Sequence, residues 1–388
     1  MGQMRALVGV ALVVALAGVF APGAVARLAR GPATRLVRVD LERAVGAPGH
    51  VVVALPAWYS PERNPHLPLV ISPAGRGGTA LGNARRFGDL PGRLGFIVVS
   101  ADLPGRLFLR RSWAAPNEIG ELSRLPELVT RALPYLRFDP DRVYTAGDSM
   151  GGQEVLMLVA RRPDLLAAAV AADPVTDFLR RWYAFPFSEN SRGDQKLATR
   201  EVGTTPDAAP WLYLRRSPDQ FAPTIAFAGV PVRIWWSTAD EVVIGQATEQ
   251  TGLFVRLLRR LNPRAPVSQV VTHGRHGQSF FAANRLPAMV RFLLSHRRHG
   301  PPATGFSYVS WLPTATVWGW RFQAASVGHG FWRVDRVRSG GFATSSPVEL
   351  RVRPPDAPDW ALVDGSPTAV IGGTVVVPAG SHVVQLVP

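Results

Sequence analysis

The chain has 388 residues, a formal net charge of +15 and no cysteine. The absence of cysteine excludes disulfides, thiolate metal sites and lipid attachment at a signal-peptide cysteine. Lys196 is the only lysine, so the charge comes from arginines, which are spread along the chain rather than gathered in one run, and we expect no nucleic-acid partner. The length suits a large domain followed by a small one.

The N-terminal segment has the pattern of a secretory signal peptide. Arg5 precedes an apolar run from Ala6 to Phe20, and Ala24-Val25-Ala26 has the small residues of a cleavage site. We therefore expect residues 1–26 to be removed and the mature protein to be secreted. The alternative is an uncleaved membrane anchor, because the apolar run extends toward Ala26, although Pro22 argues against it.

From residue 35 to residue 296, short apolar strands alternate with helices, which predicts a mostly parallel sheet covered on both faces. The expected strands are 35–40, 50–55, 67–72, 96–100, 142–146, 167–172, 232–237 and 267–272. The expected helices are 80–94, 118–136, 153–162, 245–261 and 285–296.

Residues 173–229 interrupt this alternation and are expected to form a loop-rich insertion that serves as a lid or as one wall of a pocket. The insertion is rich in aromatic residues: Phe178, Trp182, Tyr183, Phe185, Phe187, Trp211 and Tyr213. These side chains suit an apolar or aromatic acyl group, and they suit equally well the core of the lid itself.

The expected strand 142–146 leads directly into Gly147-Asp148-Ser149-Met150-Gly151 and then a helix, which is the pattern of a nucleophile elbow. A serine at such a turn holds a backbone conformation that costs roughly 1–3 kcal/mol, and its neighbours two positions away must be small. Ser149 is the candidate nucleophile, and the Met150 N–H is a candidate donor to an oxyanion. The alternative is a glycine-rich helix start with Ser149 as a capping residue.

Two further strand ends carry candidate partners for Ser149. Asp240 follows the expected strand 232–237, and His276 lies in the loop after the expected strand 267–272. Functional groups gather at the carboxyl ends of strands in open α/β sheets. Serine needs an adjacent base, imidazole titrates near neutral pH, and a carboxylate fixes the imidazole tautomer. The order serine, aspartate, histidine is that of an α/β-hydrolase.

Other assignments remain open at this point. His273 is an alternative base, although it directly follows the strand. Asp173 and Asp177, which follow the expected strand 167–172, are alternative acids, and Asp240 itself could instead cap the next helix.

A second oxyanion donor is expected from the loop after the third strand, Ser72-Pro73-Ala74-Gly75-Arg76-Gly77-Gly78. The N–H of Arg76 is the first choice and that of Gly75 the second. An ordinary glycine turn is the alternative. Nothing in the chain has metal-ligand spacing, and no cofactor is expected.

The run 138–152, with residues 162–170, 216–219 and 231–243, resembles the catalytic domain of the prolyl-oligopeptidase group and its secreted esterase relatives, such as polyhydroxybutyrate depolymerase-like and feruloyl-esterase-like enzymes. The resemblance implies an α/β-hydrolase fold and the triad Ser149, Asp240 and His276. This chain has Ala74-Gly75 where many relatives have His-Gly. The short segment 27–66 has no room for the large N-terminal propeller of the oligopeptidases, which favours ester over peptide hydrolysis.

After residue 300 the pattern changes to short strands separated by Gly, Pro and Ser turns, which predicts a small sandwich-like β-domain. The expected strands are 306–311, 316–324, 331–338, 348–352, 368–371, 374–377 and 382–387. Five tryptophans lie here: Trp311, Trp318, Trp320, Trp332 and Trp360. If exposed, they would stack on sugar rings or a polymer surface; if buried, they would form the core.

The sequence thus predicts an α/β-hydrolase domain at residues 27–300, with a lid at 173–229, and a C-terminal all-β domain at 301–388. The predicted function is a secreted serine hydrolase that acts on a small-molecule or polymeric carboxylic ester. A serine peptidase is the alternative, and a non-catalytic binding protein on the same fold is the third hypothesis.

Overall fold

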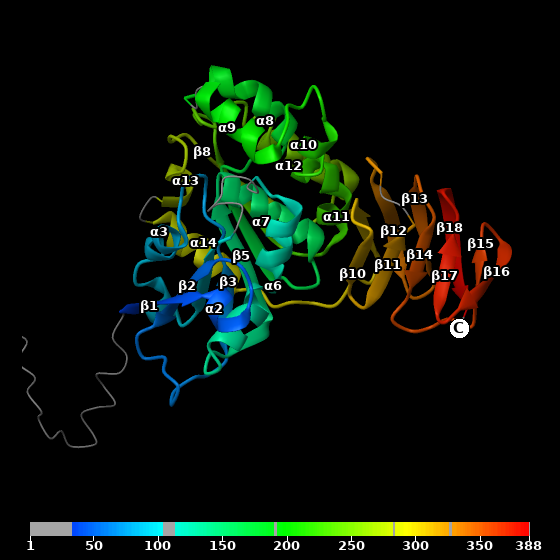
Figure 1. Cartoon of the computed structure of the whole chain (residues 1–388), viewed down its shortest axis with the longest axis horizontal. Coiled ribbons are helices and arrows are strands. Elements are labelled where there is room, and N and C mark those ends of the chain that lie inside the picture. Colours follow the sequence, from blue (N-terminus) through cyan, green and yellow to red (C-terminus); the bar gives the residue numbers. More distant parts are fainter. Residues whose placement is uncertain (1–32, 104–112, 190–191, 282–283, 326–327, 388) are drawn as a thin grey trace, which may run out of the picture.

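The computed structural model describes residues 33–103, 113–189, 192–281, 284–325 and 328–387. The predicted signal peptide, residues 1–26, lies outside the described residues. Within the described ranges, no helix is both long and apolar enough to cross a membrane. Figure 1 shows a helix-covered sheet on one side and an all-β part on the other.

The first part of the chain is built on an eight-stranded sheet of order β1-β2-β4-β3-β5-β6-β7-β8. Its strands are β1 (Thr34–Asp40), β2 (His50–Pro56), β3 (Leu67–Ile71), β4 (Ile97–Asp102), β5 (Phe138–Asp148), β6 (Ala168–Ala172), β7 (Val232–Ser237) and β8 (Val267–Thr272). β2 pairs antiparallel with β1 and β4, and every other pairing of this sheet is parallel. The predicted strands and the mostly parallel sheet are confirmed.

Helices cover both faces of this sheet because its central strands are apolar on both sides. One face packs on α6 (Pro116–Ala132), α7 (Met150–Arg161) and α12 (Thr251–Leu261). The other packs on α4 (Leu90–Leu94) and α14 (Arg285–Leu294). The short helices α2 (Leu41–Val45), α3 (Ala80–Arg86) and α13 (Gln278–Phe281) complete this part.

All five expected helices have somewhat different bounds, and two of them differ most. The expected helix 80–94 is two helices, α3 and α4, because Gly88 adopts a φ of 55° between them. The expected helix 245–261 begins only at Thr251, since Gly245 has a φ of 75° and its carbonyl accepts from three following N–H groups in a tight turn.

The prediction that residues 173–229 are loop-rich is wrong, because this insertion is largely helical. It forms α8 (Phe178–Ala184), η1 (Phe185–Phe187), α9 (Arg192–Val202), α10 (Trp211–Leu214), η2 (Pro218–Phe221) and α11 (Ala222–Phe227). These helices are short, and their stability comes from packing rather than from an apolar period visible in the sequence.

The insertion has a core of its own. Phe178 stacks between Trp113, at 4.9 Å between ring centroids, and Tyr213, at 5.1 Å. Met150 and Val243, which adjoin the candidate residues Ser149 and Asp240, belong to the same cluster. Phe178, Phe185 and Tyr213 are therefore lid core, whereas Phe187 is 80% exposed.

The C-terminal part is a ten-stranded antiparallel sheet of order β10-β11-β14-β17-β16-β15-β18-β13-β12-β9. Its strands are β9 (Phe306–Ser310), β10 (Thr314–Val317), β11 (Trp320–Ala324), β12 (Trp332–Arg338), β13 (Gly341–Ser346), β14 (Leu350–Arg353), β15 (Trp360–Val363), β16 (Ser366–Ile371), β17 (Thr374–Val377) and β18 (Gly380–Val387). One buried cluster draws residues from both ends of the sheet, as Tyr308 on β9 lies 6.1 Å from Phe322 on β11. The predicted sandwich-like all-β domain is confirmed.

The expected strand 316–324 is instead the hairpin β10–β11. Trp318 and Gly319 both have positive φ, 47° and 83°, which is the backbone of a two-residue hairpin turn. Two strands, β13 and β15, were not expected from the sequence. Of the five tryptophans, Trp320 and Trp332 are buried, Trp311 and Trp318 are partly buried, and Trp360 is 44% exposed.

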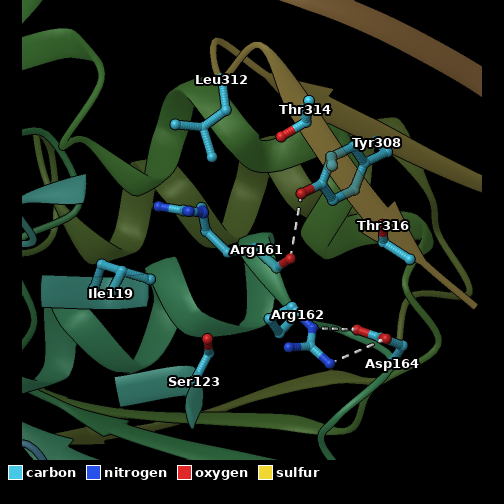
Figure 2. A pocket seen from close by; sticks show the side chains of 10 residues that line it. Ile119, Ser123, Arg161, Arg162, Asp164, Tyr308, Leu312, Thr314 and Thr316 are labelled. Atoms are coloured by element: carbon cyan, nitrogen blue, oxygen red, sulfur yellow. Dashed lines mark hydrogen bonds and ion pairs between the residues drawn. The ribbon is translucent and has the colours of Figure 1, made fainter. Parts of the chain in front are cut away.

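The β-domain packs against the hydrolase part through β9. The Val309 N–H donates to Thr224 Oγ1 on α11 at 2.8 Å, and the Tyr308 hydroxyl donates to the Arg161 carbonyl at the end of α7 at 3.2 Å (Figure 2). Phe331 lies edge-on to Phe221 at 5.5 Å. The two parts of the chain therefore share a packed interface.

Candidate active site

Ser149 occupies the single residue between β5 and α7, with φ 56° and ψ −124°. A residue other than glycine in this conformation carries strain of about 1–3 kcal/mol, so the backbone expected of a nucleophile elbow is present. The Ser149 N–H donates to the Ala172 carbonyl on β6 at 2.8 Å. Its side chain makes no capping hydrogen bond to the start of α7, so the reading as a capping serine is wrong.

The two glycines of the elbow are required by close packing. A Cβ atom on Gly147 would lie 2.8 Å from the backbone of Gly151 and 3.0 Å from the Pro73 carbonyl oxygen. A Cβ atom on Gly151 would lie 2.5 Å from the same oxygen. The loop after β3 is thus pressed directly against the turn that presents Ser149.

Asp240 and His276 meet in the loops that follow the carboxyl ends of the neighbouring strands β7 and β8. His276 Nδ1 lies 2.9 Å from Asp240 Oδ1 and 2.8 Å from Oδ2. The Asp240 side chain is only 1% exposed. Its Oδ1 accepts from the Val242 and Val243 N–H groups at 3.0 and 2.7 Å, and its Oδ2 accepts from Gln246 Nε2 at 3.2 Å. These three hydrogen bonds fix the orientation of the carboxylate independently of its contact with His276.

This setting determines the protonation of His276. Burial lowers the pKa of His276, but the hydrogen bond and charge of Asp240, together with the charges of Asp173 and Asp148, outweigh burial and raise that pKa above its ordinary value of 6.5. Because Nδ1 donates its proton to Asp240, the neutral ring carries its lone pair on Nε2. Nε2 is the nitrogen that can accept a proton from a reacting group.

The alternative base and acids have other partners. His273 is exposed, and its Nδ1 lies 2.7 Å from Thr238 Oγ1. Asp173 is buried, with Oδ1 accepting from the Ser237 N–H and Oδ2 from the Gly277 N–H, both at 3.0 Å. Asp173 thereby ties together the loops that carry Asp240 and His276. Asp177 caps α8 through the Arg180 N–H at 2.9 Å.

The candidate oxyanion donors lie on both sides of the elbow. Met150 is the first residue of α7, where N–H groups have no intrahelical partner. Gly75 adjoins the elbow from the other side, since a Cβ atom on it would lie 3.3 Å from Asp148 Oδ2. The Arg76 guanidinium points to the lid, where Nη1 lies 2.7 Å from Glu201 Oε2 and the group covers the Trp113 ring at 5.3 Å. Arg76 thus links the loop after β3 to the insertion.

Sequence reasoning missed two polar groups beside Asp240. Gln246 orients Oδ2, and no period or motif points to it. Arg181 is a buried lid residue whose guanidinium lies 3.9 Å above the Phe185 ring. Burial lowers the pKa of Arg181 to about 10 against the opposing charges of Asp240 and Asp194. An arginine in a stretch expected to be a loop gives no signal of burial.

Among the described residues, one group could offer three ligand atoms to a metal ion, because the ligand atoms of Asp173, Asp240 and His276 lie within 4.8 Å of one another. Both oxygens of each carboxylate already accept hydrogen bonds from protein N–H groups. The two Asp240 oxygens also lie 2.9 and 2.8 Å from His276 Nδ1, so this cluster is linked internally by hydrogen bonds.

The mostly parallel sheet, the strained serine at its elbow and the helices on both faces define an α/β-hydrolase fold. Residues 92–278 match the family model described as the prolyl oligopeptidase family. This match confirms the resemblance that the sequence predicted. No curated protein matches the chain.

Solved structures show the same fold. The acylaminoacyl peptidase of Pyrococcus horikoshii superposes with a TM-score of 0.52 at 14% identity, over 68% of this chain and 42% of the other. A puromycin-hydrolyzing peptidase of Mycobacterium tuberculosis gives 0.51 at 21% identity, over 67% and 38%. The dipeptidyl peptidase 4 of Porphyromonas gingivalis gives 0.50 at 18% identity, over 68% and 35%. The chain thus matches less than half the length of these structures.

Proposed function

We propose that the protein hydrolyses carboxylic esters by acyl transfer through Ser149, with His276 as the base and Asp240 as the residue that orients it. The observation that carries the proposal is the contact of 2.8 Å between His276 Nδ1 and a carboxylate that is almost completely buried. In the sheet order, β5 leads to Ser149, β7 to Asp240 and β8 to His276, so all three follow carboxyl ends of the same sheet.

The proposed reaction has two halves. His276 Nε2 accepts the proton of the Ser149 hydroxyl as its oxygen attacks the ester carbonyl carbon. The N–H of Met150, with that of Arg76 or Gly75, donates to the oxyanion. Collapse breaks the bond to the leaving alcohol, which takes the proton from His276 and leaves an acyl-serine. Water then repeats these steps, releasing the carboxylic acid and restoring Ser149.

Asp240 has a separate role in this scheme. As the Nε2 proton is gained, imidazolium forms beside the Asp240 carboxylate, whose negative charge stabilises it without itself becoming protonated. The hydrogen bonds from Val242, Val243 and Gln246 support this role because they fix the orientation of the carboxylate.

A serine peptidase is the second candidate function. The match of residues 92–278 to the prolyl oligopeptidase family favours it, and the structures named above are peptidases. The ester is the first choice because an alkoxide leaves more readily than an amide anion and an ester carbonyl is more electrophilic than an amide carbonyl. A triad that cleaves amides therefore also cleaves esters, whereas the reverse does not follow.

The experiment that tests this proposal compares kcat/KM for a p-nitrophenyl ester and a p-nitroanilide of the same acyl group. Ser149→Ala is expected to abolish both activities. Ser123→Ala, which removes a hydroxyl that bonds the Gly120 carbonyl on α6, is the matched control and should retain them. Anilide cleavage comparable to ester cleavage would favour the peptidase, and ester turnover unchanged in Ser149→Ala would exclude Ser149 as the nucleophile.

We also propose that residues 1–26 direct export and are removed after Ala26. The basic residue, the apolar run and the small-residue cleavage site support this proposal. The exposed Trp360 on β15 supports a further role of the β-domain in stacking on a sugar or polymer surface.

A further inference from the structure

A cavity of about 850 Å³ lies where the lid meets the β-domain. Its walls come from α10 and the residues around it on one side, and from the segments that follow β9 and precede β12 on the other. The volume falls within the range of sites for small organic ligands, about 300–1,000 Å³. None of the residues proposed for catalysis lines it.

The polar centre of this cavity is Arg215. Its guanidinium carbon lies 4.9 Å from the ring centroid of Trp311 and 5.8 Å from that of Trp211. The two indoles meet edge-to-face at 5.7 Å, with an angle of 87° between their planes. The His329 ring also contacts Trp211, with 5.9 Å between the two ring centroids. An arginine is thus held in place by rings from both parts of the chain.

The charge of Arg215 is not matched by protein groups. Its side chain makes no hydrogen bond or ion pair with any residue that the structure describes, and its Nε is buried without a partner. Burial lowers the pKa of Arg215. A guanidinium partly removed from water without an anion is costly, and the two indole faces offset only part of that cost.

Apart from Arg215 and His329, the side chains of the cavity wall are apolar. Leu212, Leu214 and Pro313 line it beside the two tryptophans. A ligand that fits these walls has an apolar body, and a ligand that completes the site presents an anion to the free edge of Arg215. A carboxylate matches the planar fork of a guanidinium and accepts two parallel hydrogen bonds from it.

A second cavity at the same interface offers a contrast (Figure 2). It measures about 420 Å³ and includes Arg161 and Arg162. Arg162 already donates from Nε and Nη2 to Asp164, at 2.9 and 3.3 Å, and Arg161 Nη1 donates to the Pro116 carbonyl at 3.0 Å. These arginines have protein partners, whereas Arg215 has an open edge in a larger and more apolar space.

We propose that this cavity binds a hydrophobic carboxylate, an aryl or alkyl acid whose carboxylate pairs with Arg215 and whose apolar body packs between the lid and the β-domain. The inference is independent of the reaction at Ser149. A bound acid would contact α10 of the lid and the β-domain at once, so it would stabilise the interface between them.

The probe is naphthalene-2-carboxylate, titrated calorimetrically into the full chain beside its neutral counterpart, 2-naphthamide. The native protein is expected to bind the acid more tightly than the amide. Arg215→Gln should weaken binding of the acid by about tenfold or more, because a hydrogen-bonded ionic contact is lost, and should leave binding of the amide unchanged. Arg63→Gln is the matched control, since Arg63 covers the Trp58 ring at 4.9 Å outside the cavity.

A second variant tests the location. Ala208 lines the cavity and is exposed, so Ala208→Trp fills the space without touching the charge and should weaken binding of both compounds. If Arg215→Gln does not fold, as shown by loss of its native melting transition, the effect of Ala208→Trp on binding of the acid tests the proposal by itself. The proposal is overturned if the acid does not bind, if acid and amide bind equally, or if neither Arg215→Gln nor Ala208→Trp changes the affinity for the acid.

Discussion

Replacing Asp240 by asparagine tests the candidate site most directly, because the contacts of this side chain dictate how the new amide must lie. Oδ1 accepts two backbone N–H groups at 3.0 and 2.7 Å, and Oδ2 accepts from Gln246. The amide oxygen will keep the position that faces the two backbone donors. The amide NH₂ group then takes the Oδ2 position, 2.8 Å from His276 Nδ1, and donates to that nitrogen, while Gln246, which donates to Oδ2 in the native protein, must turn its own amide over.

This reversal changes the tautomer of His276. With Nδ1 accepting, the neutral ring carries its proton on Nε2 and has no lone pair there for the Ser149 hydroxyl. A triad whose aspartate becomes asparagine loses on the order of 10⁴ in kcat by this route, which corresponds to about 5 kcal/mol of transition-state stabilisation. We expect Asp240→Asn to lose a similar factor in kcat/KM for a p-nitrophenyl ester.

The pH dependence gives a second readout. The base must be neutral, so kcat/KM of the native protein should rise as pH increases through the pKa of His276, which lies above 6.5. Asp240→Asn removes the strongest group that raises this pKa and leaves burial, which lowers it. The residual activity should therefore have its midpoint at a lower pH than the native activity.

Asp177→Asn is the matched control, because asparagine caps a helix as well as aspartate and Asp177 caps α8. Its kcat/KM should equal that of the native protein. If folded Asp240→Asn stays within about tenfold of native activity, Asp240 is not the residue that orients the base. If Asp173→Asn shows the large loss instead, Asp173 is the residue that orients the base.

Three further outcomes are expected. Gly151→Ala places a Cβ atom 2.5 Å from the Pro73 carbonyl oxygen and should displace the loop after β3, which lowers kcat by about 10²-fold or more. Gly120→Ala is the control, because its Cβ atom would meet no other atom within 4 Å. This variant should stabilise α6 by about 0.5–1 kcal/mol in urea unfolding. Unchanged kcat in Gly151→Ala would contradict this packing. Arg76→Met leaves the Glu201 side chain, which is 2% exposed, without its ion-pair partner and should lower the free energy of unfolding by about 3 kcal/mol. Adding Glu201→Leu to this variant should restore most of the lost stability. Equal stability of the native protein and both variants would contradict the pairing. Intact mass of the exported protein should correspond to a chain that begins at residue 27, and the mass of the full chain would contradict cleavage.

The sheet could be predicted from the sequence because its central strands, such as β3 and β6, are buried on both faces and form apolar runs between polar segments. β7 and β8 have the bounds that were expected, and the all-buried run of β6 differs by one residue. The elbow is equally local, since Gly147 and Gly151 must sit two residues from Ser149 wherever this turn occurs. Strand order brings Asp240 and His276 to the same region, because both come after carboxyl ends of neighbouring strands.

The polar neighbours of the site could not be predicted in this way. Gln246 reaches Asp240 from a turn, and Asp173 joins the loops of Ser237 and Gly277 through backbone N–H groups. Backbone donors have no signature in the sequence, since every residue except proline carries one. The carboxylate that faces an imidazole and the carboxylate that fastens two loops therefore remain indistinguishable until the loops are placed.

The lid shows why short elements resist prediction more generally. The four residues of α10, Trp211–Leu214, form a single turn, too short to display an apolar period. Tyr213 on this turn is buried in the lid core against Phe178, while Trp211 packs on Trp311 of the β-domain. One turn of helix is thus divided between two cores, and Arg215 follows it into the space between them. Only tertiary contacts decide this division, so the sequence reveals the aromatic residues of the lid without revealing which of them belong to the interface.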